Sequence, residues 1–297
     1  MNRLIDGVIE FKHYREQDYQ AVCDFLISLN ESDKRYINWN WARFEWMYEH
    51  PEFDKDLIEH IGLWWEHDRV VGAAIYDMYF GEAFCGVLPE YKDLYADILV
   101  YAEQSLSDDE GIAVAIEDND NEKIQIAKQL GFKKIDQTEN VMSCEIQRHR
   151  KYVMEEEIHI VELDPGKEVE QFAWILWQGF NHGTDREEFE KNDGHIKQIR
   201  KHLNTRLSLA AVTMQNEPVA YVCLWYDKRT DYAYIEPVCT VPDYRGKGIA
   251  KALLYEAFNR ACEMGANTAY VISDMEFYSK LGLTDSKHYT FYKISKS

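Results

Sequence analysis

The chain has 297 residues, of which 46% are hydrophobic, and it carries a formal net charge of -20 at pH 7. A charge of this sign excludes a general affinity for nucleic acid, because it repels phosphates. No apolar run reaches the ~18 residues that a membrane span needs, and the first residues show no signal-peptide pattern. We therefore expect a cytoplasmic protein of one large or two ordinary domains, without nucleic-acid or membrane partners, acting as a monomer or homodimer.

The cysteines predict neither a metal site nor a disulfide framework. No two of them are spaced as CxxC, and most lie among apolar neighbours, so buried and reduced thiols are expected. They are Cys23, Cys85, Cys144, Cys223, Cys239 and Cys262.

Negative charge is concentrated in the first half. Residues 1–150 hold 31 acidic and 15 basic side chains, a net of -16, whereas residues 151–297 hold 22 and 18, a net of -4. Such an excess usually serves as a solvated, solubilising surface. The alternative is that the first half helps to form an acidic wall that attracts a cationic substrate.

The predicted elements follow the same order twice. Each half should contain a strand, two helices, three strands, a long helix, a short strand, a short helix and closing strands. The first-half ranges are 8–15, 18–30, 41–50, 69–87 (a strand pair), 95–106 and 111–118, and the second-half ranges are 156–164, 169–181, 186–204, 217–240 (a strand pair), 249–266 and 268–273.

Two short motifs support an internal repeat. "LPEYKD" at 88–93 matches "VPDYRG" at 241–246, and "LGF" at 130–132 matches "LGL" at 281–283 at nearly the same offset. The glycines of the second pair, Gly131 and Gly282, suit the ends of helices. We predict an α/β fold with a mixed sheet, made of two tandem domains, 1–150 and 151–297. Each would be a twisted, mostly antiparallel sheet flanked by helices.

The stretch "VPDYRGKGIA" at 241–250 stands where a strand gives way to a helix. The first N–H groups of a helix have no helical partner and carry partial positive charge, which makes this end a natural anion site. Gly246 and Gly248 place no side chain before the backbone, and Arg245, Lys247 and Lys251 add positive charge. Neither GxGxxG nor GxxxxGK[ST] is present, and a purely structural turn is the alternative.

Residues 245–250 fit the R/Q-x-x-G-x-G/A pattern of the GCN5-related N-acetyltransferase (GNAT) superfamily. "EPVCTVPDY" at 236–244 resembles the fourth strand that precedes this pattern, and "FYSKLGL" at 277–283 is similar to the superfamily's Y-x-x-L-G-F. The resemblance covers 156–297 well and extends to 1–150 through the repeat, so the chain resembles a tandem acetyltransferase.

The resemblance implies acetyl-CoA as the acyl-donor substrate and an amine as the acceptor. Backbone N–H groups of Gly246, Gly248, Ala250 and Lys251 would hold the pyrophosphate. The backbone of Val238 and Thr240 would pair with pantetheine. The N–H of Val238 would point at the thioester oxygen, where a fixed donor stabilises the developing negative charge. The implied donor-binding residues are Val238, Cys239, Thr240, Arg245, Gly246, Lys247, Gly248, Ile249, Ala250 and Lys251.

Tyr278 and Glu236 are the candidate acid and base. Tyr278 stands where the superfamily often has a tyrosine acid, although a core tyrosine is the alternative. Strand alternation puts Glu236 on the same face as Val238, and a charge in an apolar strand is costly unless it is paired. A base acting directly or through water, a structural hydrogen bond and an anchor for the substrate amine all stay open for Glu236. Cys239 should face the other way, which favours direct attack over a cysteine intermediate.

The first copy of the motif lacks the features that the second one offers. Lys92-Asp-Leu-Tyr95 replaces the glycine frame, Asp93 would repel a pyrophosphate, and Ala127 stands in the place of Tyr278. We expect a degenerate first domain that does not bind CoA productively and helps to shape the acceptor pocket. A second ligand site is the alternative.

The acceptor is expected to be a small cationic molecule with a primary amine. The superfamily usually lines its acceptor site with the region that corresponds to 177–190, which makes His182, Asp185 and Glu188 candidates, although a solvated loop would look the same. Three other functions stay open. They are a non-catalytic acyl-CoA-binding regulatory module, a protein or peptide N-acetyltransferase and a mycothiol-type thiol-precursor synthase.

Overall fold

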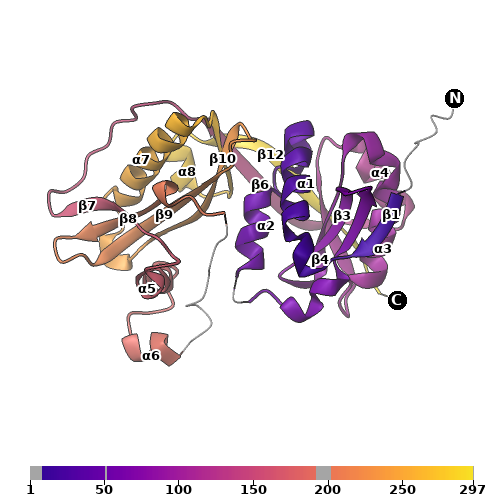
Figure 1. The fold of residues 1–297 in the computed structure, drawn as a ribbon, viewed down its shortest axis with the longest axis horizontal. Helices are drawn as coiled ribbons and strands as arrows, with labels where there is room; N and C mark the ends of the chain where they lie inside the picture. The colour runs from indigo at the N-terminus through magenta and orange to yellow at the C-terminus, as the bar shows by residue number, and fades with distance from the viewer. Residues whose placement is uncertain (1–8, 51, 192–201, 297) are drawn as a thin grey trace. The chain divides into compact units, whose positions relative to one another are not determined.

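The computed structural model describes residues 9–50, 52–191 and 202–296. The chain divides into two compact units (Figure 1). Unit 1 comprises Met1–Tyr48, Phe53–Val141 and Asp285–Ser297, and unit 2 comprises Glu49–Glu52 and Met142–Thr284. The repeat-based ranges 1–150 and 151–297 differ from these units, because residues 142–150 count with unit 2 and the last strand counts with unit 1. Among the described residues, no helix is long and apolar enough to cross a membrane.

Unit 1 is a sheet with helices on its faces. Its strand order is β1-β2-β3-β4-β5-β12, followed by β6. The β4–β5 pair is parallel, and the other described pairs are antiparallel. The strands are β1 (Ile9–His13), β2 (Gly62–Glu66), β3 (Arg69–Asp77), β4 (Tyr79–Val87), β5 (Ile112–Glu117), β6 (Lys133–Glu145) and β12 (Thr284–Ile294), and the helices are α1 (Tyr19–Ser32), α2 (Trp41–Tyr48), α3 (Tyr95–Ser105) and α4 (Asn121–Gln129).

The last strand of the chain completes the sheet of unit 1. Tyr289, Phe291 and Tyr292 of β12 are all buried, and β12 runs antiparallel to β5 from Tyr289↔Glu117 to Ile294↔Ile112. The repeat had suggested that each half supplies its own closing strands. In the structure, the closing strand of the second repeat belongs to the first unit.

Unit 2 repeats the plan with the strand order β6-β11-β10-β9-β8-β7. Its β9 is buried along almost its whole length, because helices cover both faces (Figure 1). Val222 and Leu224 pack in the core beneath α7, while Tyr221 contacts Phe172 of α5 on the other face. The strands are β7 (Ile158–Glu162), β8 (Ser208–Thr213), β9 (Pro218–Tyr226), β10 (Tyr232–Thr240) and β11 (Thr268–Ile272), and the helices are α5 (Val169–Gly179), α6 (Arg186–Lys191), α7 (Ile249–Met264) and α8 (Glu276–Lys280).

These features confirm the predicted fold class. The mixed sheet and the flanking helices recur in both units, and Gly131 and Gly282 have positive φ at the ends of α4 and α8. The predicted helix over 186–204 is a short α6 as far as residue 191, and its continuation lies outside the described residues.

The strands β10 and β11 of unit 2 pair with each other over a short distance only. β10 pairs in parallel with β11 at Tyr232, Ala233 and Tyr234. From Ile235 onward, the described register of β10 is with β9 alone. The second half of β10 therefore leads away from β11, toward the glycine turn.

Buried tyrosines predict an alkaline limit to stability. Burial is the main cause that raises the pKa of Tyr36, Tyr95 and Tyr289 well above the ordinary value. The folded state thus holds the phenol protons more tightly than the unfolded state does. The contribution of these tyrosines to the free energy of unfolding is therefore intact below about pH 10 and is lost as pH rises beyond it. Each such tyrosine lowers the free energy of unfolding by about 1.4 kcal/mol per pH unit above about pH 10.

Circular dichroism and tyrosinate absorbance, followed together from pH 9 to 12, test this expectation. Unfolding and ionisation of these tyrosines should occur in one transition. Ionisation of all tyrosines while the far-ultraviolet signal is still native would contradict it.

Candidate active site in unit 2

The glycine turn presents bare backbone at the start of a long helix. Gly246 and Gly248 have φ of 77° and 78°, in the left-handed region that favours glycine. A Cβ on either one would meet no atom of the described residues within 4 Å. Gly248 precedes α7, and no described side chain caps this helix. The turn is an open cradle in which an anion reaches the N–H groups that a helix start leaves unpaired.

Two lysines surround this cradle. Lys247 and Lys251 are exposed, and their Nζ atoms lie 4.7 Å and 5.4 Å from the ring centroids of Tyr244 and Tyr255. Ile249 is buried in the core and fixes the first turn of α7. The lysines therefore add positive charge at the surface of the turn, and Ile249 contributes structure.

Arg245 is engaged differently. Its Nε donates to the carbonyl oxygen of Thr240 at 2.9 Å, and its Nη2 donates to the carbonyl oxygen of Gly179 at 2.9 Å. The guanidinium thus contacts the end of β10 and the end of α5. Sequence reasoning had assigned this side chain to the anion only.

Along β10, exposure alternates toward the turn. Glu236, Val238 and Thr240 are half-buried, whereas Pro237 and Cys239 are buried. The register shifts between Ile235 and Val238. At this irregularity the indole Nε1 of Trp225 donates to the carbonyl oxygen of Glu236 at 2.6 Å. Trp225 therefore fixes the backbone from which the Glu236 carboxylate projects, a role that no sequence pattern indicated.

Tyr278 on α8 is within the electrostatic range of Glu236. The tyrosine is buried, and burial is the main cause that raises its pKa well above the ordinary value, with the charge of Glu236 as the second cause. The phenol stays protonated at neutral pH and is therefore available as a donor. The acid and base roles of Tyr278 and Glu236 stay predictions.

Cys239 has neither the exposure nor the acidity of a nucleophile. Burial raises the pKa of its thiol to about 12, and its Sγ lies 3.6 Å from the carbonyl oxygen of Ile175 in α5. A reactive cysteine needs a thiolate at neutral pH. The contact with α5 makes Cys239 a packing residue.

The three acceptor candidates are exposed and have local contacts. Asp185 Oδ1 accepts the N–H groups of Glu187 at 2.8 Å and Glu188 at 3.3 Å, so it caps the start of α6. The ring of His182 lies 5.0 Å from that of Trp177. These contacts give Asp185 a structural role, while His182 and Glu188 present polar groups to solvent.

Residues 169–283 match the sequence model of the Acetyltransferase (GNAT) family. These residues form a GNAT acetyltransferase domain. The match contains the glycine turn, the second half of β10 and α8, and it confirms the resemblance read from the motifs. Acyl-CoA is the donor in this family. No curated protein matches the chain.

Solved structures extend the likeness to nearly the whole chain. A tandem GNAT protein from the clavulanic acid biosynthesis pathway covers 97% of this chain and 98% of its own, with 13% identity and a TM-score of 0.63. A GCN5-related N-acetyltransferase from Sphaerobacter thermophilus covers 97% and 95%, with 15% identity and a TM-score of 0.57. N-myristoyltransferase of Saccharomyces cerevisiae with bound myristoyl-CoA covers 100% and 81%, with 12% identity and a TM-score of 0.52. At these identities the likeness concerns the fold, and it includes the tandem arrangement.

The corresponding turn of unit 1 has no cradle. Residues Pro89–Leu94 form a 3-10 helix that leads straight into α3, without a glycine in the left-handed region. The Nζ of Lys92 is 2.8 Å from the carboxylate of Glu122. Unlike the GNAT domain, unit 1 presents no bare backbone at this helix start.

Charged side chains line the pocket beside that turn. Lys123 forms ion pairs with Asp120 and Asp33, and its Nζ lies 4.1 Å from the ring centroid of Tyr36. The pocket, which Pro89 and Lys92 help to line, measures about 80 Å³. Sequence reasoning did not anticipate the ion pairs of Lys123, and a first domain that does not bind CoA productively stays a prediction.

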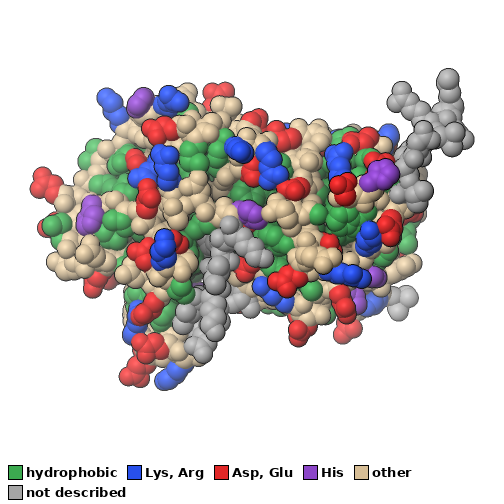
Figure 2. Space-filling model, in the orientation of Figure 1, with side chains coloured by type: hydrophobic (Ala, Val, Ile, Leu, Met, Phe, Trp, Pro, Cys, Tyr) green, Lys and Arg blue, Asp and Glu red, His purple; other side chains and the backbone are tan. Residues whose placement is uncertain are grey.

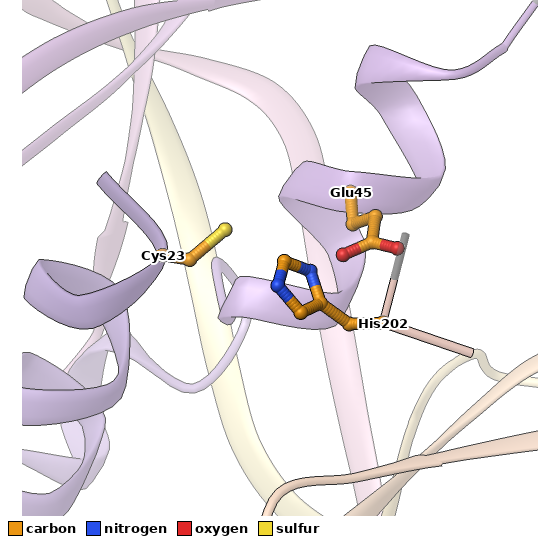
Figure 3. A group of neighbouring side chains, drawn as sticks. All are labelled: Cys23, Glu45 and His202. Carbon is orange, nitrogen blue, oxygen red and sulfur yellow. The ribbon is translucent and has the colours of Figure 1, made fainter. Parts of the chain in front are cut away.

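Unit 1 brings a cysteine and a glutamate together in its interior. Cys23 on α1 and Glu45 on α2 are buried, with their ligand atoms within 4.8 Å of each other (Figure 3). His202, also labelled in the figure, belongs to unit 2. The absence of a metal stays a prediction.

Proposed function

We propose that the chain is an N-acetyltransferase that moves acetyl from acetyl-CoA to a primary amine of a small, cationic molecule. The reaction is a direct attack in a ternary complex. One observation carries the proposal. In the GNAT domain, an open left-handed glycine turn stands at the start of α7, directly after the strand that carries Glu236.

In this proposal the glycine turn binds the donor. Backbone N–H groups of Gly246, Gly248 and Ala250 hold the pyrophosphate, since the cradle leaves them accessible. The half-buried Val238 and Thr240 lie along the path from the turn to Glu236, which suits pairing with pantetheine. The N–H of Val238 then meets the thioester oxygen, where negative charge develops.

Glu236 and Tyr278 handle the protons. The Glu236 carboxylate, directly or through water, takes a proton from the acceptor ammonium, and the freed amine nitrogen attacks the thioester carbonyl carbon. A C–N bond forms, the C–S bond breaks, and the sulfur receives the phenol proton of Tyr278. The proton that the attacking nitrogen loses as the amide forms restores the phenol. The products are an amide and the free thiol of CoA. Because the pKa of Tyr278 is raised, this tyrosine serves as a donor and not as a base.

The choice of a cationic acceptor rests on charge. The excess of 16 acidic side chains in residues 1–150 sets up a field that favours approach of cations. On the face drawn in Figure 2, Asp and Glu are spread among Lys and Arg and do not form one patch. The attraction is therefore long-range steering, which salt screens within about 10 Å at 0.1 M ionic strength.

A thiol-release assay with acetyl-CoA and a panel of amines tests the function. We expect release that depends on the amine, with polyamine-like and aminoglycoside-like acceptors at least about tenfold faster than neutral or acidic ones at low salt. The preference should shrink as salt is added. Equal rates for acidic, neutral and cationic amines would remove the charge argument, and no release with any amine would favour the regulatory module.

Tyr278→Phe separates catalysis from binding in the same assay. We expect a fall in kcat of about 10²-fold, the usual size of a general-acid contribution, with unchanged affinity for CoA by calorimetry. Tyr95→Phe is the matched control, because Tyr95 is also a buried tyrosine and belongs to unit 1. If both variants retain the wild-type rate, Tyr278 is a core tyrosine only.

A further inference from the structure

Among the described residues, one carbonyl group at the end of α5 is satisfied by a side chain. The last four carbonyl groups of a helix lack helical partners. In α5, those of Leu176, Trp177 and Gln178 accept N–H groups from the three residues that follow the helix. The fourth, on Gly179, accepts Nη2 of Arg245, which lies 66 residues later in the chain.

The contact is built from several matched features. A Cβ on residue 179 would lie 2.6 Å from both Cβ and Sγ of Cys239, so only glycine lets α5 approach β10 this closely. The Cys239 Sγ lies 3.6 Å from the carbonyl oxygen of Ile175, one turn earlier in α5. The same guanidinium holds the carbonyl oxygen of Thr240 at 2.9 Å.

Arginine suits this position better than lysine. Its planar guanidinium presents several donors in fixed directions, whereas an ammonium is a single point charge. A cation at the negative end of a helix is also favourable, by about 0.3–1 kcal/mol at a surface. A guanidinium turned toward a phosphate would give up both carbonyl contacts. Its two hydrogen bonds therefore point to a connection between elements.

We propose that Arg245 is a positioning residue that couples the donor turn to α5, so that CoA bound at the turn orders the C-terminal end of that helix. The inference rests on the proposed function, since it takes the turn as the CoA site. Binding of the pyrophosphate fixes the backbone from Thr240 to Lys251, and Arg245 transmits this order to Gly179. The loop that begins there carries the acceptor candidate His182, so the donor prepares the acceptor side.

Amide hydrogen exchange of the whole chain, with and without saturating CoA, tests the coupling. In the wild type we expect CoA to slow exchange in peptides that cover 246–251 and in peptides that cover 172–180. In Arg245→Ala, the first effect should persist and the second should fall to less than about a third of its wild-type size. Gly179→Ala, which pushes α5 away from Cys239, should have the same selective effect with Arg245 intact.

Lys247→Ala is the matched control, because it removes a neighbouring cation that has no contact with α5 among the described residues. At saturating CoA it should retain both regions of slowed exchange, while its CoA affinity falls and becomes less sensitive to salt. Arg245→Ala should retain the salt dependence of the wild type. If it instead loses that dependence as Lys247→Ala does, Arg245 is a phosphate ligand and the proposal fails.

The outcomes separate this inference from the proposed function. Slowed exchange at 246–251 without any change at 172–180 in the wild type overturns the coupling and leaves the CoA site in place. An unchanged response of α5 in Arg245→Ala does the same. No slowing at the turn with CoA overturns both.

Discussion

Gly248→Ala is expected to lower the affinity for CoA by about 100-fold while the protein stays folded. The residue has φ of 78°, so alanine costs about 1–2 kcal/mol of backbone strain. It causes no clash in the free protein, because a Cβ there meets nothing within 4 Å. In the proposed complex, the same Cβ would occupy the space of the pyrophosphate. Loss of hydrogen bonds to a charged group, at about 1.5–3 kcal/mol each, gives the expected factor.

Gly131→Ala is the control for strain alone. Gly131 also has a positive φ, 96°, at the end of α4, and the nearest atom to its Cβ is a side-chain carbon of Ile294 at 3.5 Å, an ordinary contact. In thermal unfolding, Gly248→Ala and Gly131→Ala should lose similar amounts of stability. In calorimetry with CoA, only Gly248→Ala should lose affinity. Wild-type affinity in a folded Gly248→Ala protein would show that the pyrophosphate does not approach this backbone.

The wild type should bind one CoA per chain, and a second tight site would contradict the predicted degenerate state of unit 1.

The parts of the candidate site that sequence reasoning located are those that depend on short stretches of chain. The glycine pair at 246 and 248 implies a left-handed turn before a helix, and the alternation of Glu236 and Val238 follows from strand geometry. Tyr278 could be singled out only through the motif, because nothing else distinguishes it among 20 tyrosines. The effect of the Glu236 charge on its pKa needed the structure.

Contacts between distant residues escaped prediction. Arg245 and Gly179, Lys123 and Asp33, and Trp225 and Glu236 meet only because strands and helices bring them together. Each of these side chains also has a plausible local interpretation, as a phosphate ligand, a surface charge or a core aromatic residue. Burial and partner identity decide among such interpretations, and neither can be read from one sequence.

The largest effect on stability is expected from dividing the chain at residue 150, where the repeat alone would place the boundary. A chain of 1–150 lacks β12, and with it the buried Tyr289, Phe291 and Tyr292. Removing a buried aromatic side chain costs about 3–5 kcal/mol, and a domain is typically stable by only about 5–15 kcal/mol. The open edge of β5 is then free to pair with other chains. We expect fragment 1–150 to aggregate or to unfold without a cooperative transition.

The complementary fragments provide the control. A chain of 151–297 loses Met142 and Ile146, which are buried in the core of unit 2, and it keeps a β12 that has no β5 to pair with. A chain of 142–284 retains that core and omits the unpaired strand, so it should show a sharper thermal transition by circular dichroism, although it is shorter. If 151–297 instead unfolds as cooperatively as the full chain, the pairing of β12 with β5 is dispensable. The boundary would then follow the sequence repeat and not the strands that fill each core.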